Sequence, residues 1–320
     1  MGLNEFLKSK RLYMLFLLPF IALALAFFSN ILQNIPDSPL LSAGIINLPF
    51  LSGLDGQGMI IINVSIILCL AYLLFYINER YKVVGQTTTL PSLIYVLLTS
   101  VLVGHLGLSN LLVAIICVVF AISRLQSAIN NTKSGRAVFD FGLYICITVL
   151  LAPKLVLLIL WSVSVLLFSG RSTLKDIMAL LFGLLTPLVF TAFYYFWIDR
   201  LPELPELFIN EVFAGEFIRD IPSMEYVRLG ILGLILLLSL SNIMNYYPVS
   251  VVNQRRGILS MVSLLVFLGL TMFIIPGNFY DFMYLLALPL SFIYTQYFVT
   301  HRVRVVGNIL FLLLLATCFL

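Results

Sequence analysis

The chain opens with MGLNEFLKSKRLYMLFLLPFIALALAFF (residues 1–28), in which basic residues precede a long apolar run. This run is longer than the core of a secretory signal peptide, and no convincing small-residue cleavage site follows it. We therefore expect the run to be retained as a first membrane span. The basic residues before it place the N-terminus on the cytoplasmic side.

The rest of the chain has the same character. Of its 320 residues 62% are hydrophobic and only 10% are charged, whereas a soluble domain carries roughly 25% charged residues. No soluble fold of this length buries so much apolar surface. The composition therefore predicts an all-α, polytopic membrane protein that forms a single transmembrane domain over residues 1–320.

Charged residues divide the chain into eleven apolar segments, which we interpret as about eleven transmembrane helices with the N-terminus in and the C-terminus out. The segments are approximately 11–30, 59–78, 90–105, 107–123, 137–153, 155–170, 177–198, 227–246, 257–275, 280–298 and 303–320.

The charges themselves determine the orientation. With the N-terminus inside, 14 of the 18 basic residues fall in cytoplasmic loops, as the positive-inside rule requires. The basic residues left on the outer side are Lys154, Arg200, Arg219 and Arg228. Ten of the 14 acidic residues also fall outside, so the outer face is predicted to be acidic.

Two outer loops, 31–58 and 199–226, are long enough to form structure of their own. Helices of about 16 residues reach only about 24 Å, less than a hydrocarbon core of about 30 Å. The short hairpins that span residues 90–123 and 137–170 are thus expected to stop below the outer surface, unless the segment boundaries differ by a few residues. The resulting depression would be roofed by the two loops and lined by His105 and Lys154.

Two acidic residues of the first outer loop are candidate catalytic groups. Asp55 lies in the glycine-rich stretch FLSGLDGQG (residues 50–58), and Asp37 lies between two prolines in NIPDSPL (residues 34–40). Either is a turn residue or an outer-face general base or cation ligand.

The second outer loop combines acids, arginines and an amphipathic pattern. Leu207, Phe208, Val212 and Phe213 recur at helical spacing after two prolines, so a short surface helix is expected. Arg200 and Arg228 flank the loop, where they either clamp a phosphate or pair with the nearby acids.

Other ionisable residues are less informative. Asp140 lies one turn into a span, with Arg136 four residues earlier as its expected partner. Thr173 or Ser172 is expected to cap a helix near Asp176. The histidines and the four cysteines lack metal-site spacing, so no metal site is expected from the residues, and no nucleic-acid partner is expected either.

Residues 134–200, with APK at 152–154 and SGRSTLKD at 169–176, and residues 255–298, from RRGILSM to YTQYF, resemble an uncharacterised family of multi-spanning inner-membrane proteins of the Bacteroidota. The resemblance covers about a third of the chain. It implies a location in the bacterial inner membrane and no particular activity.

The layout of residues 134–200 is also similar to that of C-type glycosyltransferases, which take a sugar from a polyprenyl-phosphate donor at the outer face. Their catalytic acid lies in the first outer loop, a position that Asp55 or Asp37 would occupy here. Such a carboxylate acts as a general base or holds a divalent cation, the one cofactor that this resemblance implies. Lys154, Arg200, Arg228 and His105 would then bind the donor.

These observations predict an inner-membrane protein of cell-envelope glycan assembly that uses a polyprenyl-phosphate-linked sugar. Two alternatives stay open. One is a non-catalytic subunit of an envelope assembly or secretion complex, which would bind envelope protein partners. The other is a transporter of a lipid or solute.

Overall fold

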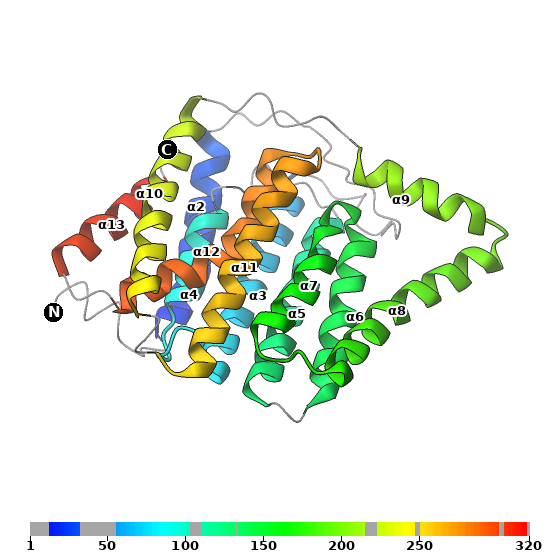
Figure 1. The fold of residues 1–320 in the computed structure, drawn as a ribbon. Coiled ribbons are helices and arrows are strands. Elements are labelled where there is room, and N and C mark those ends of the chain that lie inside the picture. The colour runs from blue at the N-terminus through cyan, green and yellow to red at the C-terminus, as the bar shows by residue number, and fades with distance from the viewer. Residues whose placement is uncertain are drawn as a thin grey trace.

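The computed structural model of the chain describes residues 13–32, 56–100, 102, 110–131, 134–214, 223–246, 250–300 and 304–318. All regular structure in these residues is helical (Figure 1). The helices are α2 (Tyr13–Leu32), α3 (Gly56–Tyr81), α4 (Leu90–Ser100), α5 (Asn110–Asn130), α6 (Gly135–Leu151), η3 (Pro153–Leu155), α7 (Leu157–Phe168), α8 (Leu174–Trp197), η4 (Leu201–Glu203), α9 (Leu204–Val212), α10 (Ser223–Tyr246), α11 (Val252–Ile274), α12 (Phe279–Thr300) and α13 (Arg304–Ala316).

The chain is an all-helical, multi-pass membrane protein. Within the described residues, α3, α5, α8, α10, α11 and α12 are long and apolar enough to cross a bilayer. Each of the eleven predicted segments contains a helix, but several of these helices are short. The 11 residues of α4 reach only about 16 Å, so the number of about eleven spans stays a prediction.

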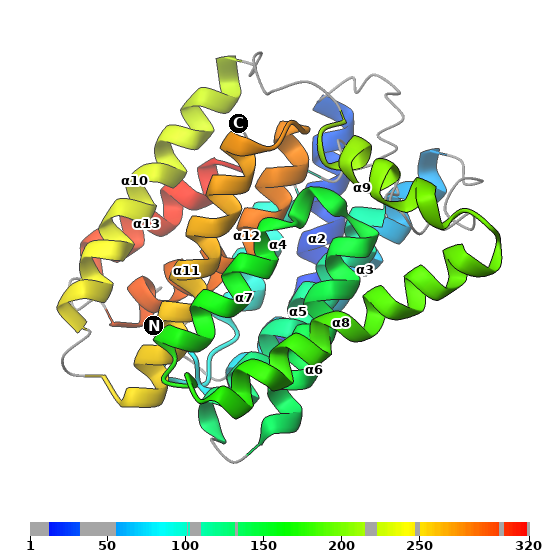
Figure 2. The same cartoon turned by 45° about the vertical axis from the view of Figure 1, so that its right-hand side comes forward.

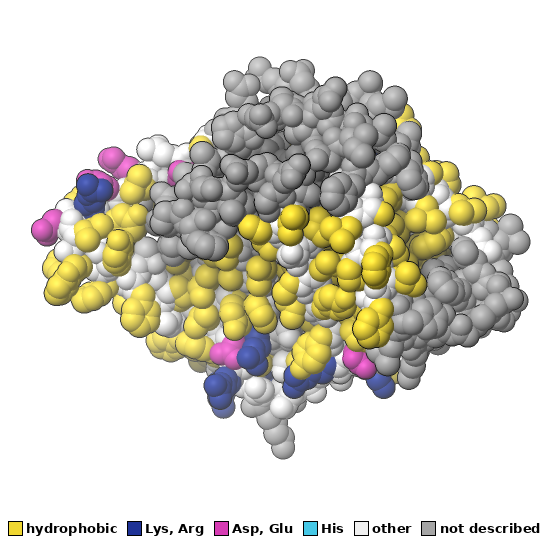
Figure 3. Space-filling model, turned by 180° about the vertical axis from the view of Figure 1, so that it is seen from behind, with side chains coloured by type: hydrophobic (Ala, Val, Ile, Leu, Met, Phe, Trp, Pro, Cys, Tyr) yellow, Lys and Arg dark blue, Asp and Glu magenta, His cyan; other side chains and the backbone are white. Residues whose placement is uncertain are grey.

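The two ends of the bundle differ in charge. Most basic side chains visible in Figure 3 gather at one end, below a broad band of apolar side chains. The connections between α3 and α4 and between α7 and α8 lie at this end, whereas the α6–α7 turn, α9 and the α11–α12 turn lie at the other (Figure 1). The basic end is the predicted cytoplasmic side.

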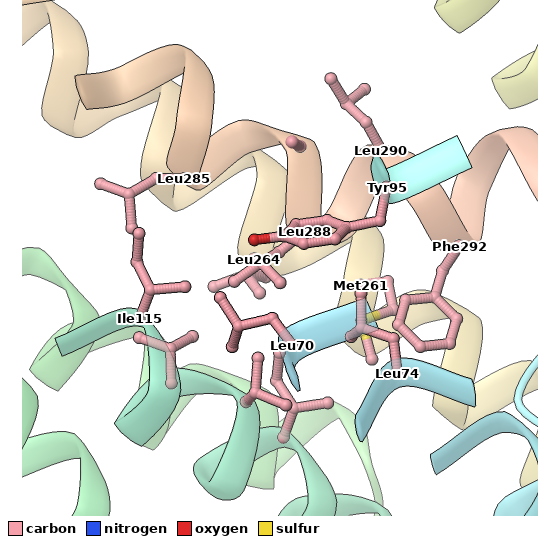
Figure 4. Packing of buried hydrophobic residues seen from close by; sticks show 14 of the residues in the cluster. Leu70, Leu74, Tyr95, Ile115, Met261, Leu264, Leu285, Leu288, Leu290 and Phe292 are labelled. Carbon is pink, nitrogen blue, oxygen red and sulfur yellow. The ribbon is translucent and has the colours of Figure 1, made fainter. Parts of the chain in front are cut away.

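The core is built around α12. In its apolar window 89% of the residues are buried, against 17% in α8 and in α10. Leucine, phenylalanine and tyrosine side chains of α12 meet α3, α4, α5 and α11 in one continuous cluster (Figure 4). Because α12 is packed on several sides, even its polar Ser291, Thr295 and Gln296 are buried, while α8 and α10 turn most of their surface outward.

Helix α8 crosses α6 at two glycines, in the most extensive helix contact of the described structure. A Cβ atom at Gly142 would lie 2.6 Å from the backbone oxygen of Leu180, and one at Gly183 would overlap the backbone oxygen of Phe139. Small residues permit such close backbone approach between membrane helices. Beyond the crossing, α8 leans away from the bundle and α9 returns towards it (Figures 1 and 2).

Two local predictions have different outcomes at the basic end. The cap of α8 is confirmed, because the Thr173 hydroxyl accepts a hydrogen bond from the Asp176 backbone at 3.3 Å. The predicted partner of Asp140 is wrong. Its carboxylate lies 3.5 Å from the guanidinium of Arg124 on α5, because helix packing brings α5 closer than the preceding turn of α6.

Candidate functional site

Three charged side chains meet in a pocket at the end of the bundle opposite the basic cluster. They are Lys154 of η3, Glu211 of α9 and Asp281 of α12. Asn278 adds one uncharged polar side chain, and most of the remaining lining is apolar, with Leu111, Leu151, Leu155, Phe282 and Leu285 among it. The pocket thus combines a small polar group with surroundings that resemble the membrane interior.

The tight turn between α6 and α7 positions Lys154. The backbone N–H of Ala152 closes α6 by donating to Thr148 at 2.9 Å, and the chain then makes the single 3-10 turn η3. Pro153 and Leu155 are buried on either side of the lysine. Their burial fixes the turn, and Lys154 is left half-buried at the pocket wall.

Helix α9 supplies Glu211. The predicted surface helix in loop 199–226 is present, and its predicted apolar face is confirmed only in part, since Phe208 is half-buried. Leu207 and Phe213 are exposed, whereas Val212 is buried and Glu211 lies half-buried beside it. Helix α9 contacts η3 directly, so the face that turns inward is the one that carries Glu211 to Lys154.

Asp281 lies in the first turn of α12. The Asn278 side chain accepts a hydrogen bond from the Tyr280 backbone at 3.2 Å and so satisfies one free N–H group at the helix start. A carboxylate in the first helical turn is also favoured by the helix dipole. The local sequence therefore places Asp281 in the pocket lining, at the start of α12.

The three groups act on one another electrostatically. Lys154 attracts both carboxylates. Burial raises the pKa of Glu211 above its ordinary value, and the nearby Lys154 offsets part of this rise. The pocket therefore offers one cation beside two carboxyl groups that can take up a proton. Protonation of a carboxyl group leaves the ammonium of Lys154 free to hold an anionic group.

The raised pKa of Glu211 predicts a pH-dependent stability. Its carboxyl holds a proton more tightly in the folded state, so folding loses free energy as the pH rises from 4.5, the ordinary value, through the folded pKa. In Glu211→Gln this titration is absent. We expect the melting temperature of the variant, relative to wild type, to increase between pH 4.5 and neutrality and then to level off.

Thermal unfolding in detergent at a series of pH values measures this difference. Glu206→Gln, on the exposed side of the same helix, is the matched control for the loss of one negative charge. A difference between Glu211→Gln and wild type that is the same at every pH would contradict the prediction.

The other residues proposed from the sequence lie elsewhere. Asp55, Asp37 and His105 fall outside the described residues. Arg200 is exposed at the end of α8, where its backbone N–H donates to Tyr195 at 2.9 Å. Arg228 lines a second pocket and pairs with Glu225 at 2.7 Å. Of the three predicted donor-binding residues that the structure describes, only Lys154 lines the pocket that holds Glu211 and Asp281.

Sequence reasoning counted Glu211 and Asp281 among the outer acids but did not select them. They are separated from Lys154 by 57 and 127 positions (211 − 154 and 281 − 154), and no short motif joins them. One signal was present for Asp281, which is an acid within the first turn of an apolar span. Ionisable residues in that position are functional candidates by default.

Metal chemistry finds limited support in the part of the chain that is described. No group of three His, Cys, Asp or Glu side chains comes together there. Glu211 and Asp281 could supply two carboxylate ligands, and Lys154 would compete with a cation for them. The ammonium group is therefore the positive charge that this pocket offers to a ligand.

Comparisons with known proteins add no relative. No protein-family model, no curated protein and no solved structure matches this chain. The function of the chain is therefore inferred from its own geometry.

Proposed function

We propose that this chain is an inner-membrane enzyme of cell-envelope glycan assembly, which transfers a sugar from a polyprenyl-phosphate donor at the outer face. One observation carries the proposal. Lys154, Glu211 and Asp281 meet in an apolar-walled pocket, at the end of the bundle that lies opposite the basic cluster. A lipid-linked, phosphate-containing substrate needs both an apolar approach and a cation at its phosphate.

The proposed chemistry assigns one role to each charged group. Lys154 binds the phosphate of the donor and stabilises the negative charge that develops there. Asp281 accepts the proton of the acceptor hydroxyl, whose oxygen attacks the sugar C1. The bond between C1 and the phosphate oxygen breaks, and polyprenyl phosphate leaves. Glu211, which also lines the pocket, orients the acceptor through a hydrogen bond.

Asp55 and Asp37 stay predicted catalytic residues of the first outer loop. A carboxylate from that loop would add to the two acids of the pocket. A divalent cation at the donor phosphate likewise belongs to the proposal.

The test begins with the lipid that the protein retains. Wild-type protein purified in mild detergent is expected to carry a polyprenyl-phosphate species, seen by native mass spectrometry, and Lys154→Ala is expected to lose it. Arg200→Ala is the matched control, since this exposed cation at the end of α8 does not line the pocket. Retention in Arg200→Ala together with loss in Lys154→Ala supports the assignment.

Asp281→Asn then separates an enzyme from a protein that only binds. It should retain the lipid and release polyprenyl phosphate from a sugar donor about 100-fold more slowly than wild type, as expected when a general base is removed. Bulk phospholipid alone on the wild-type protein would contradict the proposal. A co-purifying envelope protein in its place would favour the non-catalytic subunit, and movement of a substrate into vesicles would favour a transporter.

A further inference from the structure

A second site lies on α10 and does not belong to the Lys154 pocket. Arg228 is 8% exposed and Glu225 is 6% exposed. Both face a pocket whose remaining walls are apolar, formed by Leu98, Leu102, Leu229, Leu232, Met283, Ala287 and Leu290. On α12, Met283 and Ala287 line this pocket, whereas Asp281, Phe282 and Leu285 line the other.

The hydrogen bonds of Arg228 are incomplete. Its Nη1 donates to a carboxylate oxygen of Glu225 at 2.7 Å, and its Nε donates to the backbone oxygen of Thr317 at 3.2 Å. Its Nη2 is buried and makes no hydrogen bond to any residue that the structure describes. A buried donor without an acceptor is unfavourable, so the position favours a ligand that supplies an oxygen.

The pocket walls indicate which ligand that is. A water at Nη2 could also donate to the Glu225 carboxylate, but leucine, methionine and alanine side chains line the rest of the pocket and offer it no further polar partner. An amphiphile with one acceptor oxygen and an apolar chain satisfies both the donor and the walls. Glu225 offsets part of the positive charge, which suits a singly charged headgroup better than a polyanion.

The position in the bundle supports the same ligand. Glu225 and Arg228 occupy the first turns of α10, at the end that lies opposite the basic cluster (Figure 1). This depth corresponds to the headgroup region of one leaflet, and the leucines below it correspond to the acyl-chain region. Charge-assisted hydrogen bonds from arginine to a phosphate oxygen are among the strong ones in proteins.

We propose that the pocket between α4, α10 and α12 binds an anionic phospholipid, with its phosphate oxygen at Arg228 and an acyl chain along the leucines. This lipid is separate from the sugar donor at Lys154. Binding of the phospholipid explains why Arg228 and Glu225 lie buried in an apolar part of the bundle.

The test uses delipidated full-length protein titrated with phosphatidylglycerol in native mass spectrometry. We expect wild type to bind phosphatidylglycerol at least about tenfold more tightly than the double variant Glu225→Gln/Arg228→Gln, since one charge-assisted hydrogen bond is lost. Phosphatidylethanolamine has the same phosphate group but no net charge, so its binding should fall less than that of phosphatidylglycerol in the double variant. Ala287→Leu places a larger side chain in the pocket and keeps the ion pair of Glu225 and Arg228. It should weaken phosphatidylglycerol binding to a similar degree.

Two controls make the result specific. Lys154→Ala should bind phosphatidylglycerol as wild type does, so failure of the donor proposal and failure of this one can be told apart. Thermal unfolding, followed by Trp161 fluorescence, confirms that each variant is folded. Equal binding of the two phospholipids to wild type, unchanged binding in the double variant, or displacement by inorganic phosphate alone would overturn the proposal.

Discussion

Replacement of Gly183 by alanine should destabilise the folded protein by at least about 3 kcal/mol, the upper end of the usual cost of an extra methylene in a packed core. The added Cβ would overlap the backbone oxygen of Phe139, which belongs to α6 and cannot rotate away. The two helices would have to separate along their most extensive contact. Denaturation in detergent, followed by tryptophan fluorescence, measures the change, since unfolding exposes the fully buried Trp161 whereas Trp197 is already 77% exposed.

A matched control exists for the same substitution. Gly269 lies in α11, and a Cβ atom added there meets nothing within 4 Å. Gly269→Ala is therefore expected to be neutral or to stabilise the protein by up to about 1 kcal/mol, since alanine favours a helix over glycine. If the two alanine variants unfolded at the same denaturant concentration, the close crossing of α6 and α8 would be ruled out.

The substitution Glu225→Gln is expected to cost about 3–5 kcal/mol, because it leaves the positive charge of Arg228 buried without a counter-charge. The pair is 2.7 Å apart, and its side chains are 10% and 8% exposed. The free energy of unfolding in a zwitterionic detergent without added lipid measures this loss.

The double variant Glu225→Gln/Arg228→Gln provides the control. It removes both charges and should recover most of the stability, since the penalty comes from the unpaired charge. The two single variants and the double variant form a thermodynamic cycle. Additive effects in that cycle would show that the two side chains do not interact in the membrane-embedded protein.

The sequence was most informative where the membrane acts on each segment independently. A helix forms within every apolar segment, because unpaired backbone groups are costly in hydrocarbon and each helix satisfies its own. The predicted placement of basic residues on the cytoplasmic side and of acidic residues on the outer side likewise depends only on the charges within each connecting loop. The boundaries were less certain. Segment 90–105 was predicted as one span, but α4 ends at Ser100.

The candidate site was predictable only in part. Lys154 was selected because it is a lone cation in a short outer turn, which is local information. Glu211 comes close to Lys154 only because α8 leads away from the bundle and α9 returns to it. Asp281 comes close to Lys154 only because α12 packs at the centre of the bundle. The pair of Glu225 and Arg228 was different, since a spacing of three residues on a helix places both side chains on one face.

The close contact of α6 and α8 at Gly142 and Gly183 connects the Lys154 pocket to the surrounding lipid. Helix α8 has 24 residues, about 36 Å of helix, which exceeds a hydrocarbon core of about 30 Å. Such a helix adjusts its tilt to bilayer thickness, and α8 can pivot where its backbone meets α6. Helix α9 follows α8 after a short connection that contains η4. A change in the tilt of α8 therefore moves Glu211 as well. We expect a thinner bilayer to change the distance between Glu211 and Lys154, and the composition of the membrane would then tune the site.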